Sequence, residues 1–341
     1  MVERMSKKIT MQDIASQLGV TKVSVSKAIN NKPGLSDSLR KRILHTAREL
    51  GYAKIKADEI QKEYRFAFIS AKRFFLEDEK FYTTIYYYLN RKCMDKNCSL
   101  NCFVVGNHEE ENGILPSDLT LVKYDGIFIG GELKKEYLSL LAGLKAEKIA
   151  IDFTMTGLPF DSVIVDNFTI GYEVTGNLIE KGHTRIGFVG NIHHTNSICD
   201  RYFGYLKAMK CRNLPIQKDW YIPGINTLDG VYTQNFDLPK ELPSAFVCHC
   251  DKAAFTLMQK LESCHVQIPE DVSITSFDNT GICELTTPKL SSVNIDKKQI
   301  ALHSFNQMIN RLDNPGLAPH RIYLSGTLVE RDSILPYPSK G

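Results

Sequence analysis

The sequence lacks the long apolar runs that membrane spans and secretion signals require. No stretch of its 341 residues comes near the roughly 18 uninterrupted apolar residues of a transmembrane helix. Residues 1–17 are rich in polar and charged side chains, where a secretion signal needs an apolar core of about 7–15 residues. The sequence therefore predicts a cytoplasmic protein that is neither exported nor bound to a membrane.

Signatures of common enzymes and metal proteins are missing as well. The chain has no Gly-x-Ser-x-Gly, no P-loop and no Gly-x-Gly-x-x-Gly. Its nine cysteines are scattered and odd in number, which predicts reduced thiols rather than a disulfide framework. Cys248-His249-Cys250-Asp251 contains metal-ligand residue types, but no second Cys/His pair stands at zinc spacing. We therefore expect no enzyme activity, no metal and no cofactor.

The charge of the chain is unevenly distributed. Residues 1–62 contain 13 Lys/Arg and 6 Asp/Glu, a net charge of +7, whereas the remaining residues have a net charge of −4. The whole composition, 43% hydrophobic and 24% charged, is typical of a folded globular protein. A small basic head on a mildly acidic body indicates that a polyanion binds to the head alone.

The basic head has the pattern of three short helices. Thr10 is placed to cap the first helix, which Gly19 ends. Thr21 caps a second helix over residues 22–30, and Ser36 caps a third. Two helices joined by a short Gly-containing turn predict a helix-turn-helix, whose second helix enters the major groove of DNA. A basic three-helix bundle that binds protein is the alternative.

The residues of the head go beyond this pattern. Matches at fixed spacing over Ile9–Ala15 and Gly19–Asn30, and at Ser36, Arg40, Ile43, Ala47 and Leu50–Tyr52, closely resemble the DNA-binding domain of the LacI/GalR family of bacterial transcription regulators. The resemblance implies that Lys22, Val23 and Lys27 read bases. It also implies a DNA-binding set that faces phosphates or holds the domain on the DNA backbone: Thr10, Thr21, Ser24, Ser26 and Asn30. Simple solvation is the alternative for the two serines.

Two departures from the family affect how DNA is read. Lys27 stands where many relatives have Arg, and an ammonium cannot make the forked contact to guanine that a guanidinium makes. The segment after the head lacks the usual Pro and Asn, and a one-residue deletion is needed to place Ile60 as the apolar wedge of a minor-groove hinge helix. A plain linker is the alternative. Lys54 and Lys56 in this segment are expected to lie near phosphates, together with Lys22, Lys27 and Lys32.

The body alternates short apolar runs with helical segments. The expected strands are Phe66–Ser70, Cys102–Val105, Gly126–Ile129, Ile149–Asp152, Ser162–Val165, Arg185–Val189, Ala245–Cys248, Ser273–Phe277 and Ser292–Ile295. Such alternation predicts an α/β fold of doubly wound parallel sheets, and this number of units exceeds one comfortable sheet. Two subdomains with a cleft at the carboxyl ends of the strands are expected.

Stretches of the body also resemble the effector-binding core of the LacI/GalR family. They include Val163–Asn167, Leu178–Gly190, Ile268–Ile274, Phe277–Asn279 and Leu328–Arg331. The resemblance implies a periplasmic-binding-protein-like core in which the chain crosses between subdomains near Asp161, Leu290 and Ser325. The expected domains are thus a head and hinge over 1–62 and a core over 63–341. Within the core, the N-subdomain takes about 63–161 and 291–325, and the C-subdomain about 162–290 and 326–341.

The resemblance places an effector pocket in that core. Its residues would be Phe81, Asp152, Asp166, Arg201, Asn226 and Asp278. An Arg with several carboxylates in a cleft can bind the hydroxyl groups of a polyol, so a sugar or sugar derivative is the expected effector. Two alternatives stay open: Asp166 could only cap the following helix, and Phe81 could belong to the core.

These features together predict a sequence-specific DNA-binding repressor controlled by a small-molecule effector. The expected partners are double-stranded operator DNA, a carbohydrate and a second copy of the chain. Because the chain ends soon after Arg331 without a heptad repeat, a homodimer is favoured over a tetramer. A stand-alone sugar-binding protein and an architectural DNA binder without effector control are the alternatives.

Overall fold

The computed structural model describes residues 9–30, 32–50, 52, 63–75, 80–225 and 232–338. The chain divides into two compact units, a head of residues 1–62 and a core of residues 63–341. Four of the expected site residues, Lys54, Lys56, Ile60 and Asn226, lie outside the described residues.

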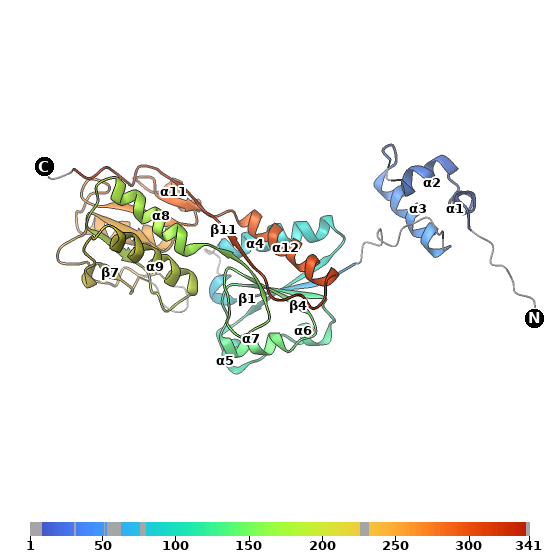
Figure 1. Ribbon diagram of the computed structural model, residues 1–341, viewed down its shortest axis with the longest axis horizontal. Helices are drawn as coiled ribbons and strands as arrows, with labels where there is room; N and C mark the ends of the chain where they lie inside the picture. The colour runs from blue at the N-terminus through green and yellow to red at the C-terminus, as the bar shows by residue number, and fades with distance from the viewer. Residues whose placement is uncertain are drawn as a thin grey trace, which may run out of the picture. The chain divides into compact units, whose positions relative to one another are not determined.

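The head consists of three helices, α1 (Met11–Leu18), α2 (Lys22–Ile29) and α3 (Asp37–Glu49) (Figure 1). Thr10 caps α1 in a capping box, because its hydroxyl accepts from the Asp13 amide while the Asp13 carboxylate accepts from the Thr10 amide. Gly19 ends α1 with a φ of 64°, a left-handed conformation that glycine adopts without strain. The three helices enclose a small apolar core of Ile14, Ala15, Val25, Ala28, Ile43, Ala47 and Tyr52.

The first subdomain of the core is a parallel six-stranded sheet in the order β11-β5-β4-β3-β1-β2. Its strands are β1 (Arg65–Ala71), β2 (Ser99–Val105), β3 (Gly126–Gly130), β4 (Glu147–Ile151), β5 (Asp161–Val165) and β11 (Arg321–Leu324). Its helices are η2 (Lys72–Phe74), α4 (Phe81–Asp95), α5 (Asn107–Asn112), α6 (Ser117–Leu121), α7 (Lys135–Ala142) and α12 (Lys297–Asp313). Figure 1 shows α4 and α12 on one face of the sheet and α5, α6 and α7 on the other.

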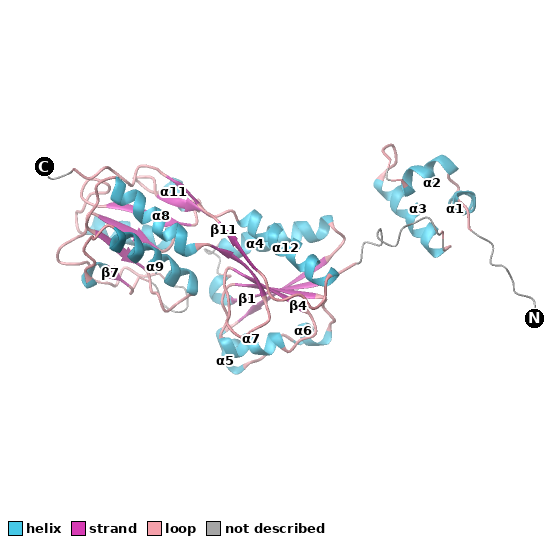
Figure 2. Ribbon diagram, in the orientation of Figure 1, coloured by secondary structure: helices cyan, strands magenta, loops and turns pink. Residues whose placement is uncertain are grey.

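The second subdomain is a six-stranded sheet in the order β12-β10-β9-β8-β6-β7. Its strands are β6 (Ile186–Val189), β7 (Tyr221–Ile222), β8 (Ala245–Cys248), β9 (Ser273–Phe277), β10 (Ser291–Asn294) and β12 (Thr327–Val329), and only the β10–β12 pair is antiparallel among the strands described. Its helices are α8 (Asn167–Glu180), α9 (Asn196–Cys211), η3 (Lys218–Trp220), α10 (Asp251–Ser263) and α11 (Ile282–Leu285). Helices α8 and α9 pack side by side (Figure 2).

Both faces of the first sheet are buried, which explains its nearly continuous apolar strands. Along β1, Phe66 and Phe68 point into one apolar cluster, with Leu89 of α4. The alternate residues Ala67 and Ile69 point into a second cluster, with residues of α7. Alternate residues of the strand therefore pack against helices on opposite faces of the sheet. This arrangement confirms the predicted α/β fold with its helix-turn-helix head.

The crossings between subdomains correct the predicted boundaries. The chain leaves the first sheet after Val165 rather than near Asp161, because β5 pairs with both β4 and β11. It leaves the second sheet after Asn294 rather than near Leu290, because β10 pairs with β9 and β12. The third crossing is at Ser325–Gly326, between β11 and β12. In both corrected cases a strand is completed before the chain crosses, so each boundary moves by one strand.

Candidate functional site

The two subdomains enclose a cavity of about 590 Å³ at the carboxyl ends of their strands. In the first subdomain, Glu132 follows β3 and Asp152 follows β4. In the second, His249 follows β8 and Asp278 follows β9. Because parallel strands end at the same edge of a sheet, each sheet directs its strand-terminal side chains toward the cavity. The polar walls of the cavity therefore come from both sheets, one in each subdomain.

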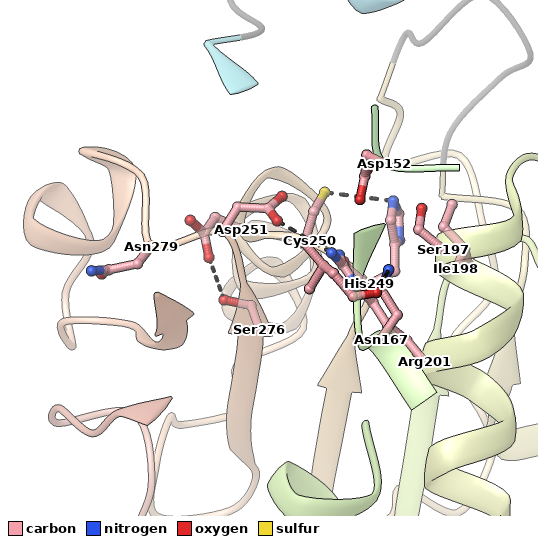
Figure 3. Close-up of polar contacts among 12 residues, drawn as sticks. Asp152, Asn167, Ser197, Ile198, Arg201, His249, Cys250, Asp251, Ser276 and Asn279 are labelled. Atoms are coloured by element: carbon pink, nitrogen blue, oxygen red, sulfur yellow. Dashed lines mark hydrogen bonds and ion pairs between the residues drawn. The ribbon is translucent and has the colours of Figure 1, made fainter. Parts of the chain in front are cut away.

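Arg201 of α9 bonds three other residues in the cavity wall, and its side chain is only 5% exposed. Its Nε donates to Oδ1 of Asn167 at 2.7 Å, and its Nη1 donates to the carbonyl of His249. Its Nη2 lies 3.4 Å from Oδ1 of Asp278. Its guanidinium also lies 4.4 Å from the ring centroid of Phe277. Figure 3 shows Arg201 reaching from its helix toward Asn167 and His249. The guanidinium is thus fixed in place before any ligand arrives.

Asp152 lies on the opposite side of the cavity and is nearly buried. Its Oδ2 accepts a 3.0 Å hydrogen bond from the Tyr82 hydroxyl, whereas its Oδ1 is buried without a hydrogen-bond partner among the described residues. Burial raises the pKa of Asp152 to about 6, although Arg201 and the Tyr82 hydrogen bond act in the opposite direction. Asp278 adds a repulsive contribution that raises this pKa further. An unsatisfied buried carboxylate oxygen is costly, and a ligand donor would relieve that cost.

His249 lines the cavity and also contacts strand β6 of the second sheet. Its Nδ1 lies 3.2 Å from the Val189 carbonyl oxygen, and its Nε2 lies 3.2 Å from the Tyr232 hydroxyl. Burial lowers the pKa of His249 to about 3, and the Arg201 charge lowers it further, so the ring is neutral near pH 7. Cys250 next to it begins α10, with its thiol accepting from the Ala253 amide. Within the described residues, no group of three or more His, Cys, Asp or Glu side chains could hold a metal ion.

Ion pairs line the cavity on the side of the first subdomain. Arg73 contacts Glu110, and Nζ of Lys134 lies 2.9 Å from Oε1 of Glu111. Between the subdomains, Oε2 of Glu132 accepts a 3.1 Å hydrogen bond from the backbone amide of Asn196 at the start of α9. This last contact links the two subdomains directly in the arrangement observed.

The structure brings together four of the six predicted effector residues. Phe81, Asp152, Arg201 and Asp278 all line the cavity. Asp166 does not line it: the Asp166 carboxylate accepts a 3.1 Å hydrogen bond from the Thr169 amide and caps α8. The alternative interpretation of Asp166 as a helix cap is therefore the one that the contacts favour.

Sequence reasoning missed several cavity residues. Tyr82 was not predicted, although it directly follows the predicted pocket residue Phe81 at the start of α4. His249 was considered for metal binding, not as the last residue of a strand edge that faces a cleft. Glu132 carried a usable signal, because it stands two residues after the buried strand β3, where a parallel sheet presents its ligand-binding residues.

The predicted DNA-reading residues lie on and around α2. Lys22 and Val23 are exposed, and the Val23 side chain is 63% exposed although it is apolar. Lys27 is half-buried. Single exposed apolar side chains are common on protein surfaces, so the predicted role of Val23 in base reading stays a prediction.

The hydroxyl and amide groups around α2 also hold the helix itself. Thr21 caps α2 by accepting from the Ser24 amide at 3.1 Å, and the two hydroxyl oxygens are 3.0 Å apart. The Asn30 side-chain amide donates to the Ser26 carbonyl at 2.9 Å. These residues therefore have a structural role in addition to their predicted contacts with the DNA backbone.

Comparison with known proteins decides the family. The description "Bacterial regulatory proteins, lacI family" fits residues 10–54, and "Periplasmic binding protein-like domain" fits residues 175–334. The chain belongs to the LacI family of bacterial regulatory proteins. The resemblance seen in the sequence is thereby confirmed, over the head and most of the core.

Curated relatives of this LacI-family chain are transcription regulators. The HTH-type transcriptional repressor PurR of Pectobacterium carotovorum is 24% identical over 96% of this chain and 98% of its own length. PurR of Actinobacillus pleuropneumoniae is 25% identical, over 95% of this chain and 98% of its own. The match spans both units, so head and core occur together in these relatives.

Solved structures show the same fold. The transcriptional regulator CelR in complex with cellobiose has a TM-score of 0.67 at 20% identity, covering 96% of this chain and 100% of its own. The lac repressor dimer bound to operator and the anti-inducer ONPF has a TM-score of 0.67 at 17% identity, with the same coverage. A LacI family regulator of Enterococcus faecium with bound ribose has a TM-score of 0.66 at 20% identity, covering 80% of this chain and 100% of its own.

Proposed function

We propose that this chain is a transcriptional repressor that binds operator DNA as a homodimer. Its affinity for the operator rises or falls when a small molecule binds in the core. The proposal places the protein in the cytoplasm, where its DNA lies, and assigns it no catalytic reaction. The observation that carries it is the 590 Å³ cavity whose walls come from both subdomains of the core. In the part of the chain described, no helix is long and apolar enough to cross a membrane.

The cavity supplies the physical basis for control by an effector. A ligand that contacts Asp152 in one subdomain and Asp278 in the other binds more tightly when the subdomains are close. Such a ligand shifts the population toward that arrangement, by an amount set by its differential affinity for the two arrangements. Coupling between sites is typically about 1–3 kcal/mol, or roughly 5–150-fold in affinity.

A carbohydrate fits the chemistry of the cavity walls. Carboxylates accept from hydroxyl groups, Arg201 is a rigid set of donors, and the rings of Phe74, Phe81 and Tyr82 offer flat apolar surfaces. The solved relatives with cellobiose and ribose support the same class of ligand.

The proposed DNA contacts place α2 in the major groove. Lys22, Val23 and Lys27 would read base edges, and the backbone-facing set would be Thr10, Thr21, Ser24, Ser26 and Asn30. Because Thr21, Ser26 and Asn30 already bond within the head, their DNA contacts would add to an ordered surface rather than order it. Lys54 and Lys56 would lie near phosphates, and Ile60 would act as the wedge.

Selection from a randomised duplex library with the full-length protein tests this proposal. A homodimer is expected to select a pseudo-palindrome whose half-sites reflect its two-fold symmetry. Recovery of single asymmetric half-sites would contradict the dimeric arrangement, and recovery of no preferred sequence would favour an architectural DNA binder.

A further inference from the structure

The charged residues of the cavity do not balance. Among the described residues that line it, five are acidic and three are basic. The three basic residues each have an acidic partner already: Arg73 pairs with Glu110, Lys134 with Glu111 and Arg201 with Asp278. Glu132 and Asp152 are left without a cationic partner of that kind.

We propose that the effector is a polyhydroxylated amine, such as an amino sugar, and that its ammonium group binds Asp152 on the side that faces Asp278. This inference rests on the proposed function, because it names the chemical class that the same cavity selects. It goes beyond a general carbohydrate site, since it requires a positive charge on the ligand.

The bonding of Asp152 supports a cationic donor. Tyr82 occupies only Oδ2, at 3.0 Å, and Oδ1 is buried without a hydrogen-bond partner among the described residues. A neutral hydroxyl group could fill that position but would leave the buried carboxylate without an ion-pair partner. An ammonium group does both, because it donates hydrogen bonds and cancels the charge.

The aromatic residues next to Asp152 also favour a cation. The rings of Phe74 and Tyr82 lie 5.2 Å apart, and those of Phe81 and Tyr82 lie 5.1 Å apart. Cations are attracted to the faces of aromatic rings, and this attraction grows when the site is desolvated. Two such contacts are present already, since Cζ of Arg73 lies 4.8 Å from the ring centroid of Phe74 and Nζ of Lys297 lies 5.7 Å from that of Phe81.

An anionic effector fits this cavity poorly. The guanidinium of Arg201 is committed to Asn167, His249 and Asp278. A phosphate or carboxylate on the ligand would have to break these bonds and would still face the carboxylates of Asp152 and Glu132. Like charges in a site of low dielectric repel strongly.

A cation also provides a way to couple binding to closure. Asp152 belongs to the first subdomain and Asp278 to the second, and the charge of Asp278 disfavours ionisation of Asp152. Arg201 of the second subdomain attracts the Asp152 carboxylate more strongly than Asp278 repels it, and the repulsion reduces this attraction across the cavity. An ammonium group between the two carboxylates replaces a repulsion with two attractions and therefore favours the closed arrangement.

The same groups predict how the binding depends on pH. Asp152 faces Tyr82 from α4, Arg201 from α9 and Asp278 at the end of β9, and its burial raises its pKa to about 6. An ammonium group binds only the ionised carboxylate. The affinity for the amine should therefore fall as the pH drops below about 6, where Asp152 takes up a proton, and it should also fall at higher pH as the ammonium group of the ligand loses its proton.

Matched ligand pairs test the inference on the full-length protein. The pairs are D-glucosamine and D-glucose, D-galactosamine and D-galactose, D-mannosamine and D-mannose, and 2-amino-1,3-propanediol and glycerol, measured by calorimetry at pH 7.5 and pH 5. We expect at least one amine to bind about tenfold more tightly than its hydroxyl counterpart at pH 7.5, and this preference to shrink at pH 5. N-acetyl-D-glucosamine, which is uncharged, should behave like the hydroxyl members.

Variants locate the effect. Asp152→Asn keeps the shape of the side chain and removes its charge, so it should abolish the preference for the amine. Glu262→Gln makes the same change of charge on the exposed side of α10 and should retain the preference. If Asp152→Asn fails to fold, the pH dependence of the wild-type protein decides the question.

Three results would overturn the inference. They are equal or tighter binding of the hydroxyl member in every pair, no binding of any amine at 10 mM, and a preference that Asp152→Asn leaves intact. The proposed function fails on a different result. A neutral sugar that changes operator affinity overturns only the inference that the effector is an amine. An amine that binds without changing operator affinity overturns only the proposed control of DNA binding.

Discussion

Nη2 of Arg201 lies 3.4 Å from Oδ1 of Asp278, and the two side chains are 5% and 17% exposed. The pair connects α9 with the end of β9 inside the second subdomain. Burial raises the pKa of Asp278, and the positive charge of Arg201 acts in the opposite direction. The guanidinium therefore offsets part of the cost of burying the Asp278 carboxylate at the wall of the cavity.

Removal of this guanidinium should destabilise the core. Arg201→Met leaves Asp278 as a largely buried charge without its partner and also removes the bond to Asn167, which should cost about 3–5 kcal/mol. Urea unfolding of the full chain, followed through the core transition, measures this loss. Arg212→Met is the control, because Arg212 and Glu180 are more exposed and 3.7 Å apart, and it should cost under about 1 kcal/mol. Equal costs for the two variants would mean that the buried pair is not a stabilising contact.

The Asp278 carboxylate should be needed for the effector response and not for DNA binding. Asp278→Asn is expected to abolish the change in operator affinity caused by the effector, while affinity without effector stays near that of the wild type, because the cavity and the head are separate units. Asp166→Asn is the matched control. It should keep the full response, since Asp166 caps α8 outside the cavity and Asn is an equally good cap. A response lost in Asp166→Asn and kept in Asp278→Asn would show that the effector binds elsewhere.

The fold could be predicted from the sequence because its periodic signals are strong. Nine strands were identifiable as apolar runs between helical segments, and their alternation with helices indicated parallel sheets. The strands β7 and β12 were missed because they are only two and three residues long, which leaves little room for a periodic pattern. The strand β11 is four residues long, like several that were identified, but it is not buried. The crossings after β5 and β10 were misplaced because the sequence does not show whether a strand at a boundary pairs with one sheet or the other.

The candidate site was predictable only in part, for a related reason. The family resemblance indicated Asp152 and Asp278, and each of them directly follows an apolar strand. Asp166 has the same signal, yet its side chain turns back to the Thr169 amide, and only the local geometry distinguishes a helix cap from a ligand contact. The roles of Tyr82 and Asn167 depend on which side chains meet across the fold, namely Asp152 and Arg201.

The buried Asp152 should make core stability depend on pH. Its pKa is raised from 3.8 to about 6 in the folded protein, so the proton that it binds stabilises the fold at low pH, and this contribution is lost as pH rises from about 4 through 6. Asp152→Asn cannot titrate, and its stability relative to wild type should therefore increase by up to about 3 kcal/mol between pH 4 and pH 7.5.

Paired urea denaturations of wild type and Asp152→Asn at the two pH values measure this difference. The comparison within each pH cancels the opposite contribution of His249, whose lowered pKa makes the fold less stable as pH falls. A difference that does not change with pH would show that folding does not raise the pKa of Asp152.

Two lysines should affect DNA binding in different ways. Lys27→Ala is expected to relax base preference at one position of the operator, costing about 1–3 kcal/mol for the preferred sequence. Lys54→Ala is expected to weaken binding to all sequences and to flatten the slope of log affinity against log salt concentration by about one unit. Affinities for a set of operator variants at several salt concentrations separate the two effects. A change in salt slope alone in both variants would remove Lys27 from base reading.

The linkage between the two ligands tests the central claim most directly. Fluorescence anisotropy of the selected operator duplex gives the affinity of the full-length protein with and without a ligand that calorimetry shows to bind the core. The account predicts that the ligand changes operator affinity by roughly 5–150-fold, and that saturating operator changes the affinity for the ligand by the same factor. Operator affinity that is unchanged at saturating ligand would contradict it.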